Sequence, residues 1–290
     1  MSTGCDSLFP PPPPAQTGGA TVREVCCRSL LNRCSIDDYS LNCYTGCRHA
    51  CAYCYARFMQ RFHPHSEPWG AFVDVKINAP EVLAREVRRM PPGSVFICSA
   101  CDGWQPVEEH YRLTRRCCGI LLDAGFRLNI LTKSRLVLRD LDILSGRDVS
   151  LGVTITTPDE KQARLWEPFA APIAGRLDVL RQARAAGIRT AVMLGPLLPG
   201  FSDDDASIRR LLSLAGEAGA DRIWTDALNP RPRVWPSVAT LLRRHRPELL
   251  PRYRAILFDP EARNRYTNDL AARINRIASE LGLSRRLCGC

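Results

Sequence analysis

The sequence predicts an α/β fold in which parallel strands and helices alternate to form a barrel or partial barrel. Three observations predict it: β-rich runs recur along the middle of the chain, amphipathic helical stretches separate them, and 290 residues with 45% hydrophobic content can bury a sizeable core. The runs recur at roughly 25–40 residues, a spacing typical of βα units. The expected strands are residues 95–98, 128–131, 151–155, 191–194 and 222–225.

The expected helix ends support this alternation. Gly125, Gly187 and Gly219 each lie just before an expected strand, where glycine suits a left-handed C-cap. Ser202 and the three aspartates after it predict the start of another helix, with the Ser202 hydroxyl as its cap.

The sequence divides into three regions. Residues 1–20 contain five consecutive prolines, which favour a disordered or polyproline tail. Residues 21–234 carry the alternating pattern and form the expected core. Residues 235–290 have helical patterns at 238–244, 248–256 and 261–281, which predict a helical C-terminal cap.

Composition excludes some classes of protein. No apolar run reaches the roughly 18 residues that a membrane-spanning helix needs, and the N-terminus lacks the pattern of a secretory signal. We therefore expect a cytoplasmic protein without a membrane partner. The net charge is +10, but only three of the 40 basic residues are lysines. Codon usage also produces such an arginine bias, so charge alone does not identify a polyanionic partner.

The cysteines carry the strongest chemical signal. Fourteen cysteines without an export signal indicate metal or redox chemistry rather than a disulfide framework. Cys47, Cys51 and Cys54 are spaced Cys-x3-Cys-x2-Cys in residues 42–54, here called the cysteine loop. Three cysteines in so short a loop can coordinate only one metal centre, and thiolate ligands favour a soft metal or an iron–sulfur cluster. Three thiolates on a four-iron cluster leave one iron open, whereas adding Cys43 would permit a closed zinc site.

The cysteine spacing, with Tyr53 just before the last cysteine, resembles the signature of the radical SAM superfamily. Further segments resemble the subgroup related to spore photoproduct lyase, and the resemblance covers about residues 22–280. These segments are residues 67–70, 74–80, 102–108, 113–116, 131–134 and 138–142.

The resemblance implies a partial (β/α)6 barrel of TIM type, with the cysteine loop after its first strand. It further implies a [4Fe–4S] cluster on Cys47, Cys51 and Cys54, with S-adenosyl-L-methionine (SAM) on the open iron. One electron then cleaves SAM to methionine and a 5′-deoxyadenosyl radical, which abstracts hydrogen from a substrate. The implied partner is an electron donor such as flavodoxin or ferredoxin.

The resemblance also suggests residues that contact SAM. Tyr53 occupies a position whose backbone contacts the adenine, and Lys133 follows a strand where it can pair with the SAM carboxylate. The remaining candidates are polar residues at strand ends: Ser99, Asp102, Thr154 and Thr156.

Three residues are candidates for the radical path. Tyr55 follows the last cluster ligand and resembles a position near SAM in spore photoproduct lyase. Cys98 and Cys101 flank the place where that family has a hydrogen-donating thiol, although a packing role is equally compatible with each residue.

Three functions remain open at this stage. The first is a radical enzyme acting on an unidentified substrate, and the second is a DNA-repair lyase acting on a photoproduct, so a nucleic-acid partner is possible. The third is a non-catalytic iron–sulfur or zinc module. A second cluster also stays open, on some of the cysteines outside the loop: Cys26, Cys27, Cys34, Cys288 and Cys290.

Overall fold

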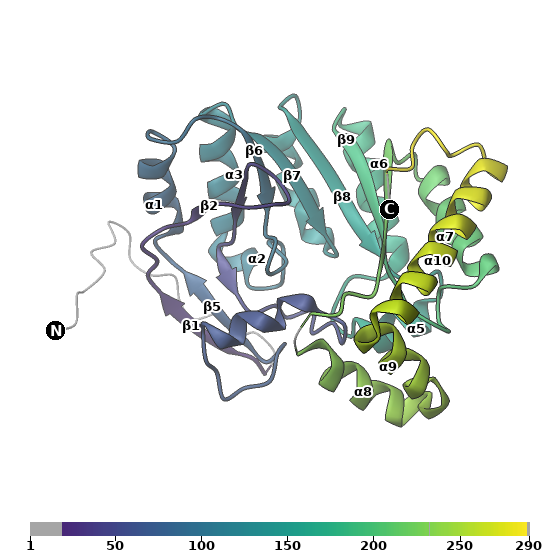
Figure 1. The fold of residues 1–290 in the computed structure, drawn as a ribbon. Helices are drawn as coiled ribbons and strands as arrows, with labels where there is room; N and C mark the ends of the chain where they lie inside the picture. Colours follow the sequence, from purple (N-terminus) through teal and green to yellow (C-terminus); the bar gives the residue numbers. More distant parts are fainter. Residues whose placement is uncertain (1–18, 232, 289–290) are drawn as a thin grey trace.

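The structure is a computed structural model that describes residues 19–231 and 233–288, so nearly all of the expected tail lies outside the described residues. Its main sheet has seven strands in the order β10-β9-β8-β7-β6-β3-β2 (Figure 1). Six of them are parallel, and only β2 runs antiparallel to its neighbour, β3. The strands are β2 (Leu31–Arg33), β3 (Tyr39–Leu41), β6 (Ser94–Ile97), β7 (Arg127–Thr132), β8 (Val149–Ile155), β9 (Arg189–Leu197) and β10 (Arg222–Ala227).

Helices follow the parallel strands along the chain and cover one face of the sheet, which confirms the predicted partial (β/α)6 barrel. Helix α3 packs on β7, α6 on β8 and β9, and α7 on β9. The helices between strands are α1 (Ala79–Glu86), α2 (Glu108–Tyr111), α3 (Leu113–Asp123), α4 (Leu141–Leu144), α5 (Glu160–Trp166), α6 (Ile173–Ala185) and α7 (Asp205–Glu217), with 3-10 helices η1 (Tyr55–Arg61) and η2 (Arg135–Asp140).

The two faces of the sheet differ in burial. On β7, Leu128 and Ile130 are buried against the helices. Asn129 and Leu131, which alternate with them along the strand, are only half-buried. Successive side chains of a strand point to opposite faces, so Asn129 and Leu131 lie on the face turned away from the helices. The side of the sheet that this face lines is here called the lumen. Near the start of β7, the Asp37 carboxylate lies on this side of the sheet and accepts a hydrogen bond from the Asn129 amide at 2.5 Å.

The helix ends agree with the sequence in one respect and differ in another. Gly125, Gly187 and Gly219 all have positive φ, as expected of C-caps. The predicted cap of α7 is wrong, because Asp204 caps this helix by accepting from the Ser207 N–H. The Ser202 hydroxyl instead accepts from the Leu198 N–H in the turn after β9.

A small second sheet, absent from the sequence prediction, holds the cysteine loop. Its strands are β1 (Thr21–Val25), β5 (Phe72–Lys76) and β4 (Tyr44–Thr45), and β4 lies inside the loop. Pairing of Tyr44 with Val75 and of Thr45 with Asp74 therefore fixes the backbone just before Cys47. Gly46 has a φ of +89°, and a Cβ there would lie 2.4 Å from the Phe72 carbonyl oxygen.

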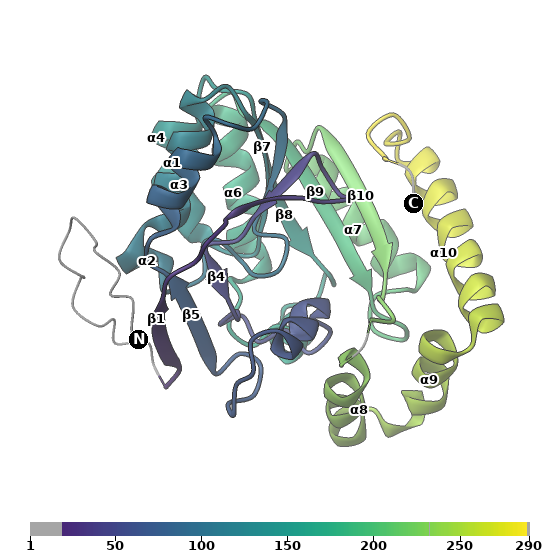
Figure 2. The ribbon, with the colours of Figure 1, turned by 60° about the vertical axis from the view of Figure 1, so that its left-hand side comes forward.

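The C-terminal region is helical, as predicted, and packs on the cysteine loop. It contains α8 (Val234–His245), the 3-10 helix η3 (Pro247–Leu249), α9 (Leu250–Phe258) and the long helix α10 (Pro260–Glu280) (Figure 2). Residues of α8 and α9 share a hydrophobic core with Cys51, Ala52 and Tyr53 of the loop. At its centre Trp166 stacks on Tyr253 with ring centroids 6.1 Å apart. Among the described residues, no helix is long and apolar enough to cross a bilayer.

Candidate active site

Cys47, Cys51 and Cys54 converge in the cysteine loop at the carboxyl end of β3. All three are free thiols, and each acts electrostatically on another of the trio. Burial raises the pKa of each thiol, that of Cys51 to about 12 against the opposing charge of Lys133. Three thiols gathered on one loop and enclosed by protein are a donor set suited to an iron–sulfur cluster. Among the described residues, no three or more Cys, His, Asp or Glu side chains lie close enough together to coordinate a single metal ion.

Gln105 holds the backbone on both sides of Cys47. Its side-chain amide donates to the Gly46 carbonyl at 3.1 Å and accepts from the Arg48 N–H at 2.9 Å. Gln105 itself is fully buried. The Arg48 guanidinium adds a hydrogen bond to the Gly70 carbonyl at 2.6 Å, so the loop is tied to two separate segments.

Asp102 joins the ends of β6 and β7 to the cysteine loop. One carboxylate oxygen accepts from the Trp104 N–H and the Thr132 hydroxyl, and the other from the Lys133 N–H. That second oxygen also lies 3.0 Å from His49 Nε2. Burial works to raise the pKa of Asp102, but the His49 imidazole and these hydrogen bonds lower it well below its usual value. Both oxygens are thus engaged within the protein, and Asp102 positions the backbone of Lys133.

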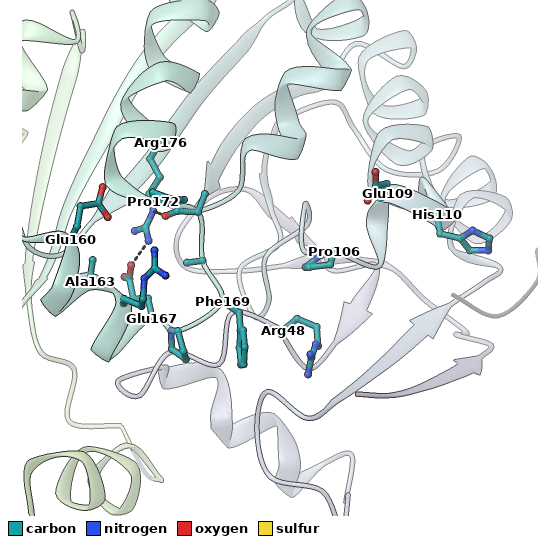
Figure 3. Close-up of a pocket in the computed structure, with 14 residues that line it drawn as sticks. Arg48, Pro106, Glu109, His110, Glu160, Ala163, Glu167, Phe169, Pro172 and Arg176 are labelled. Atoms are coloured by element: carbon teal, nitrogen blue, oxygen red, sulfur yellow. Dashed lines mark hydrogen bonds and ion pairs between the residues drawn. The ribbon is translucent and has the colours of Figure 1, made fainter. Parts of the chain in front are cut away.

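A buried ion pair lies beneath the loop. A Glu167 carboxylate oxygen lies 2.5 Å from a guanidinium nitrogen of Arg176, and both residues are almost fully buried. Figure 3 draws this pair as facing side chains joined by a dashed line. The Tyr53 hydroxyl donates to the same carboxylate, and the Thr156 hydroxyl lies 3.2 Å from it. Burial acts to raise the pKa of Glu167, but the charge of Arg176 and, to a smaller extent, that of Lys133 lower it below its usual value. The Lys133 ammonium also lies 5.7 Å from the Tyr53 ring centroid. This network therefore brings together Tyr53, Lys133 and Thr156, three of the predicted SAM residues.

Thr154 lies in a row of lumen-facing residues near the carboxyl ends of the strands. Thr154 on β8 pairs in register with Met193 on β9, which pairs with Trp224 on β10. Side chains in register point to the same face, so this row lines the lumen beside the cysteine loop. Trp224 keeps 41% of its surface exposed, an unusual state for a large aromatic residue.

The predicted radical-path residues gather at the end of β6. The Tyr55 hydroxyl donates to the Ser99 carbonyl, and burial raises the pKa of Tyr55 to about 12. A hydrogen bond to the Cys98 thiol, together with burial, raises the pKa of Cys101. Cys101 also packs against the hydrophobic group that contains Cys47. Asn42 holds this turn by accepting from the Ala100 N–H and donating to the Ser99 hydroxyl.

Cys43 is separated from the trio. It is fully buried in the main core, where its sulfur lies 3.7 Å from that of Cys117. Three of the cysteines considered for a second cluster lie apart from one another: Cys27 lies beside Asn78, Cys34 contacts the Asp37 carbonyl, and Cys288 joins the edge of β10. Cys290 lies outside the described residues.

A hollow lies outside the lumen, beside the buried network that holds Tyr53. It has a volume of about 770 Å³ and separates the Glu109–His110 region from α5 and the start of α6 (Figure 3). Arg48 and Phe169 stand between its two sides, and the Glu167–Arg176 pair forms its inner wall. The hollow therefore reaches the outer side of the network that holds Tyr53.

Several of these residues carry no signal in the sequence alone. Gln105 is within a segment that resembles the family, but its contact with the cysteine loop is not evident from spacing. Glu167 and Arg176 lie more than a hundred residues after the cysteines, in no recognisable motif. Met193 and Trp224 resemble ordinary strand residues, and only the register of the sheet shows that they share the lumen with Thr154.

Comparison with known proteins identifies relatives of the chain. The family model of the radical SAM superfamily matches residues 41–212. Uncharacterized protein Rv2578c of Mycobacterium tuberculosis (strain H37Rv) is 32% identical over 255 residues, covering 83% of this chain and 75% of that protein. Uncharacterized protein MJ0683 of Methanocaldococcus jannaschii is 34% identical over 168 residues, covering 57% of this chain but only 62% of that protein.

Among solved structures, spore photoproduct lyase complexed with dinucleoside spore photoproduct has a similar fold. The TM-score is 0.70 at 14% sequence identity, and the match covers 95% of this chain and 86% of that chain. At this identity the similarity concerns the fold alone.

Proposed function

Because the chain belongs to the radical SAM superfamily and is therefore an enzyme, we propose that Cys47, Cys51 and Cys54 bind a [4Fe–4S] cluster beside SAM in the lumen. The single observation that carries this proposal is the convergence of three free thiols, those of Cys47 and Cys51 buried and that of Cys54 half-buried, at the carboxyl end of the first parallel strand. When bound, the cluster and SAM supply a 5′-deoxyadenosyl radical for hydrogen abstraction.

The chain's own residues hold and shield this chemistry. The Lys133 ammonium, oriented by Asp102 through its backbone, is the cation proposed for the SAM carboxylate. The hydrogen bond from the Tyr53 hydroxyl to Glu167 holds Tyr53 in place, and its backbone is proposed to contact the adenine. Thr154 and Thr156 are the hydroxyl residues proposed to contact SAM at the end of the adjoining strand. Ser99 completes the polar rim proposed for SAM, whereas Asp102, with both oxygens engaged within the protein, acts through the backbone of Lys133.

Metal content and SAM cleavage test the proposal together. The purified chain is reconstituted anaerobically with iron and sulfide, and the iron and sulfide per chain are counted. SAM and dithionite are then added, and 5′-deoxyadenosine is measured. We expect about four irons and the nucleoside product, whereas zinc alone and no product would overturn the proposal in favour of a non-catalytic module.

Cysteine variants sharpen this test. Cys47→Ala, Cys51→Ala and Cys54→Ala are each expected to abolish both the cluster and 5′-deoxyadenosine formation. Cys43→Ala is the matched control, since it removes a buried thiol of the same loop that lies against Cys117. Retention of a full cluster by any variant of the trio would contradict the assignment.

A second candidate function is a DNA-repair lyase of the spore photoproduct type. The thiol of Cys101, beside Cys98 and next to the group containing Cys47, favours it because a thiol there can return hydrogen to a product radical. The test is incubation with dinucleoside spore photoproduct, SAM and dithionite. We expect two restored thymines for this function, and a reduced yield for Cys101→Ala. Absence of repair by an enzyme that does cleave SAM would leave the first proposal standing and remove this one.

A further inference from the structure

A basic groove lies on the outer side of the cysteine loop, between η1 and α8. It has a volume of about 650 Å³, and its cationic lining residues are Arg57, Arg233 and Arg244. None of the described residues that line it is acidic. Arg233 and Arg244 are exposed, so their charges act on whatever approaches this face.

The groove and the lumen use different faces of η1. Residues three apart eclipse each other in a 3-10 helix, so η1 has three faces. Tyr55 faces the lumen through its hydrogen bond to Ser99, and Ala56 with Met59 packs beside Cys47. Arg57 and Gln60 form the third face, which lines the groove. An occupant of the groove is therefore separated from the lumen by η1 and the cysteine loop.

The floor of the groove reaches two of the proposed cluster ligands. Arg57 donates from its guanidinium to the Cys51 carbonyl at 3.1 Å. Trp69 lines the groove and belongs to the hydrophobic group against which Cys54 packs. One side chain thus stands between the groove and each of these cysteines.

We propose that this basic groove is the docking surface for an acidic one-electron carrier protein, which delivers its electron to the cluster through the floor of the groove. The inference rests on the proposed function, since it requires a cluster on the trio. Charge complementarity selects an acidic face on the partner and accelerates the encounter. At each encounter the reduced cofactor of the carrier loses one electron, and the centre in the cysteine loop gains it.

The position of the groove favours a reductant over a nucleic-acid substrate. A substrate must present its reacting atom in the lumen, where the candidate SAM residues Lys133 and Thr154 lie. A carrier protein needs only a short path to the cluster, and the outer side of the loop provides one without crossing the lumen.

The experiment compares two charge reversals on α8. Arg244→Glu changes a groove residue, whereas Arg243→Glu makes the same change in net charge at an exposed neighbour that does not line the groove. Binding of flavodoxin to each reconstituted protein is measured by anaerobic titration over a range of salt. We expect Arg244→Glu to weaken binding about tenfold at low salt and Arg243→Glu less than about twofold, with the difference shrinking as salt screens the charges.

A second readout separates docking from chemistry. Formation of 5′-deoxyadenosine is driven either by reduced flavodoxin or by dithionite, and iron per chain is counted for each variant. Arg244→Glu is expected to slow only the flavodoxin reaction, with normal iron content. No product with dithionite from the wild type would mean that the proposed function fails.

Three outcomes would overturn the docking proposal while leaving the proposed function intact. The first is equal flavodoxin binding by both variants, and the second is a wild type that dithionite activates but reduced flavodoxin and ferredoxin do not. The third is loss of binding to labelled single-stranded DNA in Arg244→Glu with unchanged flavodoxin kinetics, which would assign the groove to nucleic acid.

Discussion

At the scale of single residues, the cysteine loop depends on one buried amide. Gln105→Ala removes two hydrogen bonds and leaves the Gly46 carbonyl and the Arg48 N–H without their partner. An unsatisfied buried group costs roughly 1–3 kcal/mol, so we expect lower stability and poorer retention of the cluster. Iron per chain after gel filtration and the midpoint of thermal unfolding measure the two effects.

A matched control for Gln105 is available on the surface. Gln182→Ala removes an exposed glutamine of α6 whose side chain contacts only Asp178 among the described hydrogen bonds. It is expected to change stability by less than about 0.5 kcal/mol. Equal iron retention by Gln105→Ala and this control would show that the amide does not hold the loop.

The Glu167–Arg176 pair makes a second prediction at this scale. Arg176→Met leaves a carboxylate buried without its charged partner, which costs about 3–5 kcal/mol of unfolding free energy. Adding Glu167→Gln removes the buried charge, so the double variant should be more stable than Arg176→Met alone. Urea unfolding of the cluster-free chain measures both. A double variant no more stable than Arg176→Met would refute electrostatic coupling between the two side chains.

At the scale of elements, α8 and α9 support the cysteine loop because they share a core with Cys51, Ala52 and Tyr53. Leu242→Ala opens a cavity in that core, and Leu212→Ala on α7 opens one in the main core. Each is expected to cost about 2–5 kcal/mol. Only Leu242→Ala should also lower iron retention, measured by anaerobic dialysis against a chelator. Equal iron loss in both variants would mean that the C-terminal helices do not support the loop.

The elements that were predicted correctly are those in which hydrophobic residues recur with a regular period along one continuous segment. The strands β6 to β10 and the helices α7 to α10 show such patterns, and their positive-φ glycines mark several ends. The small sheet was missed because β4 has two residues, and its pairing with β5 depends on tertiary contact rather than on any local pattern. The cap of α7 was misplaced because Ser202 and Asp204 are both good capping residues, and the preceding turn takes the hydroxyl.

The candidate site was predictable only where ligands follow one another in the chain. The spacing of Cys47, Cys51 and Cys54 identifies the loop, but nothing local connects it to Glu167 or Arg176. Asp102 illustrates the limit: its position at a strand end is evident from the sequence, whereas the engagement of both its oxygens within the protein depends on where β7 and His49 lie.

At the scale of the whole molecule, the cysteine loop separates two surfaces. The lumen lies on one side, with Thr154, Met193 and Trp224 in register, and the basic groove lies on the other. Under the two proposals above, a substrate in the lumen and a carrier protein on the basic groove can therefore bind at the same time without competing. The same division predicts that changes in the lumen affect SAM without affecting the carrier protein.

Met193→Trp tests this division from the lumen side. Met193 is half-buried and belongs to none of the hydrophobic cores, so the unfolding free energy should change by less than about 0.5 kcal/mol. The larger side chain would crowd SAM, and a crowding cost of about 1–3 kcal/mol corresponds to about 5- to 150-fold weaker binding. Anaerobic calorimetry with SAM measures the loss, while iron per chain and flavodoxin binding should match the wild type. Arg210→Trp on the outer surface of α7 is the control for the added indole. If Met193→Trp bound SAM as the wild type does, the SAM site would lie elsewhere than beside the Thr154 row.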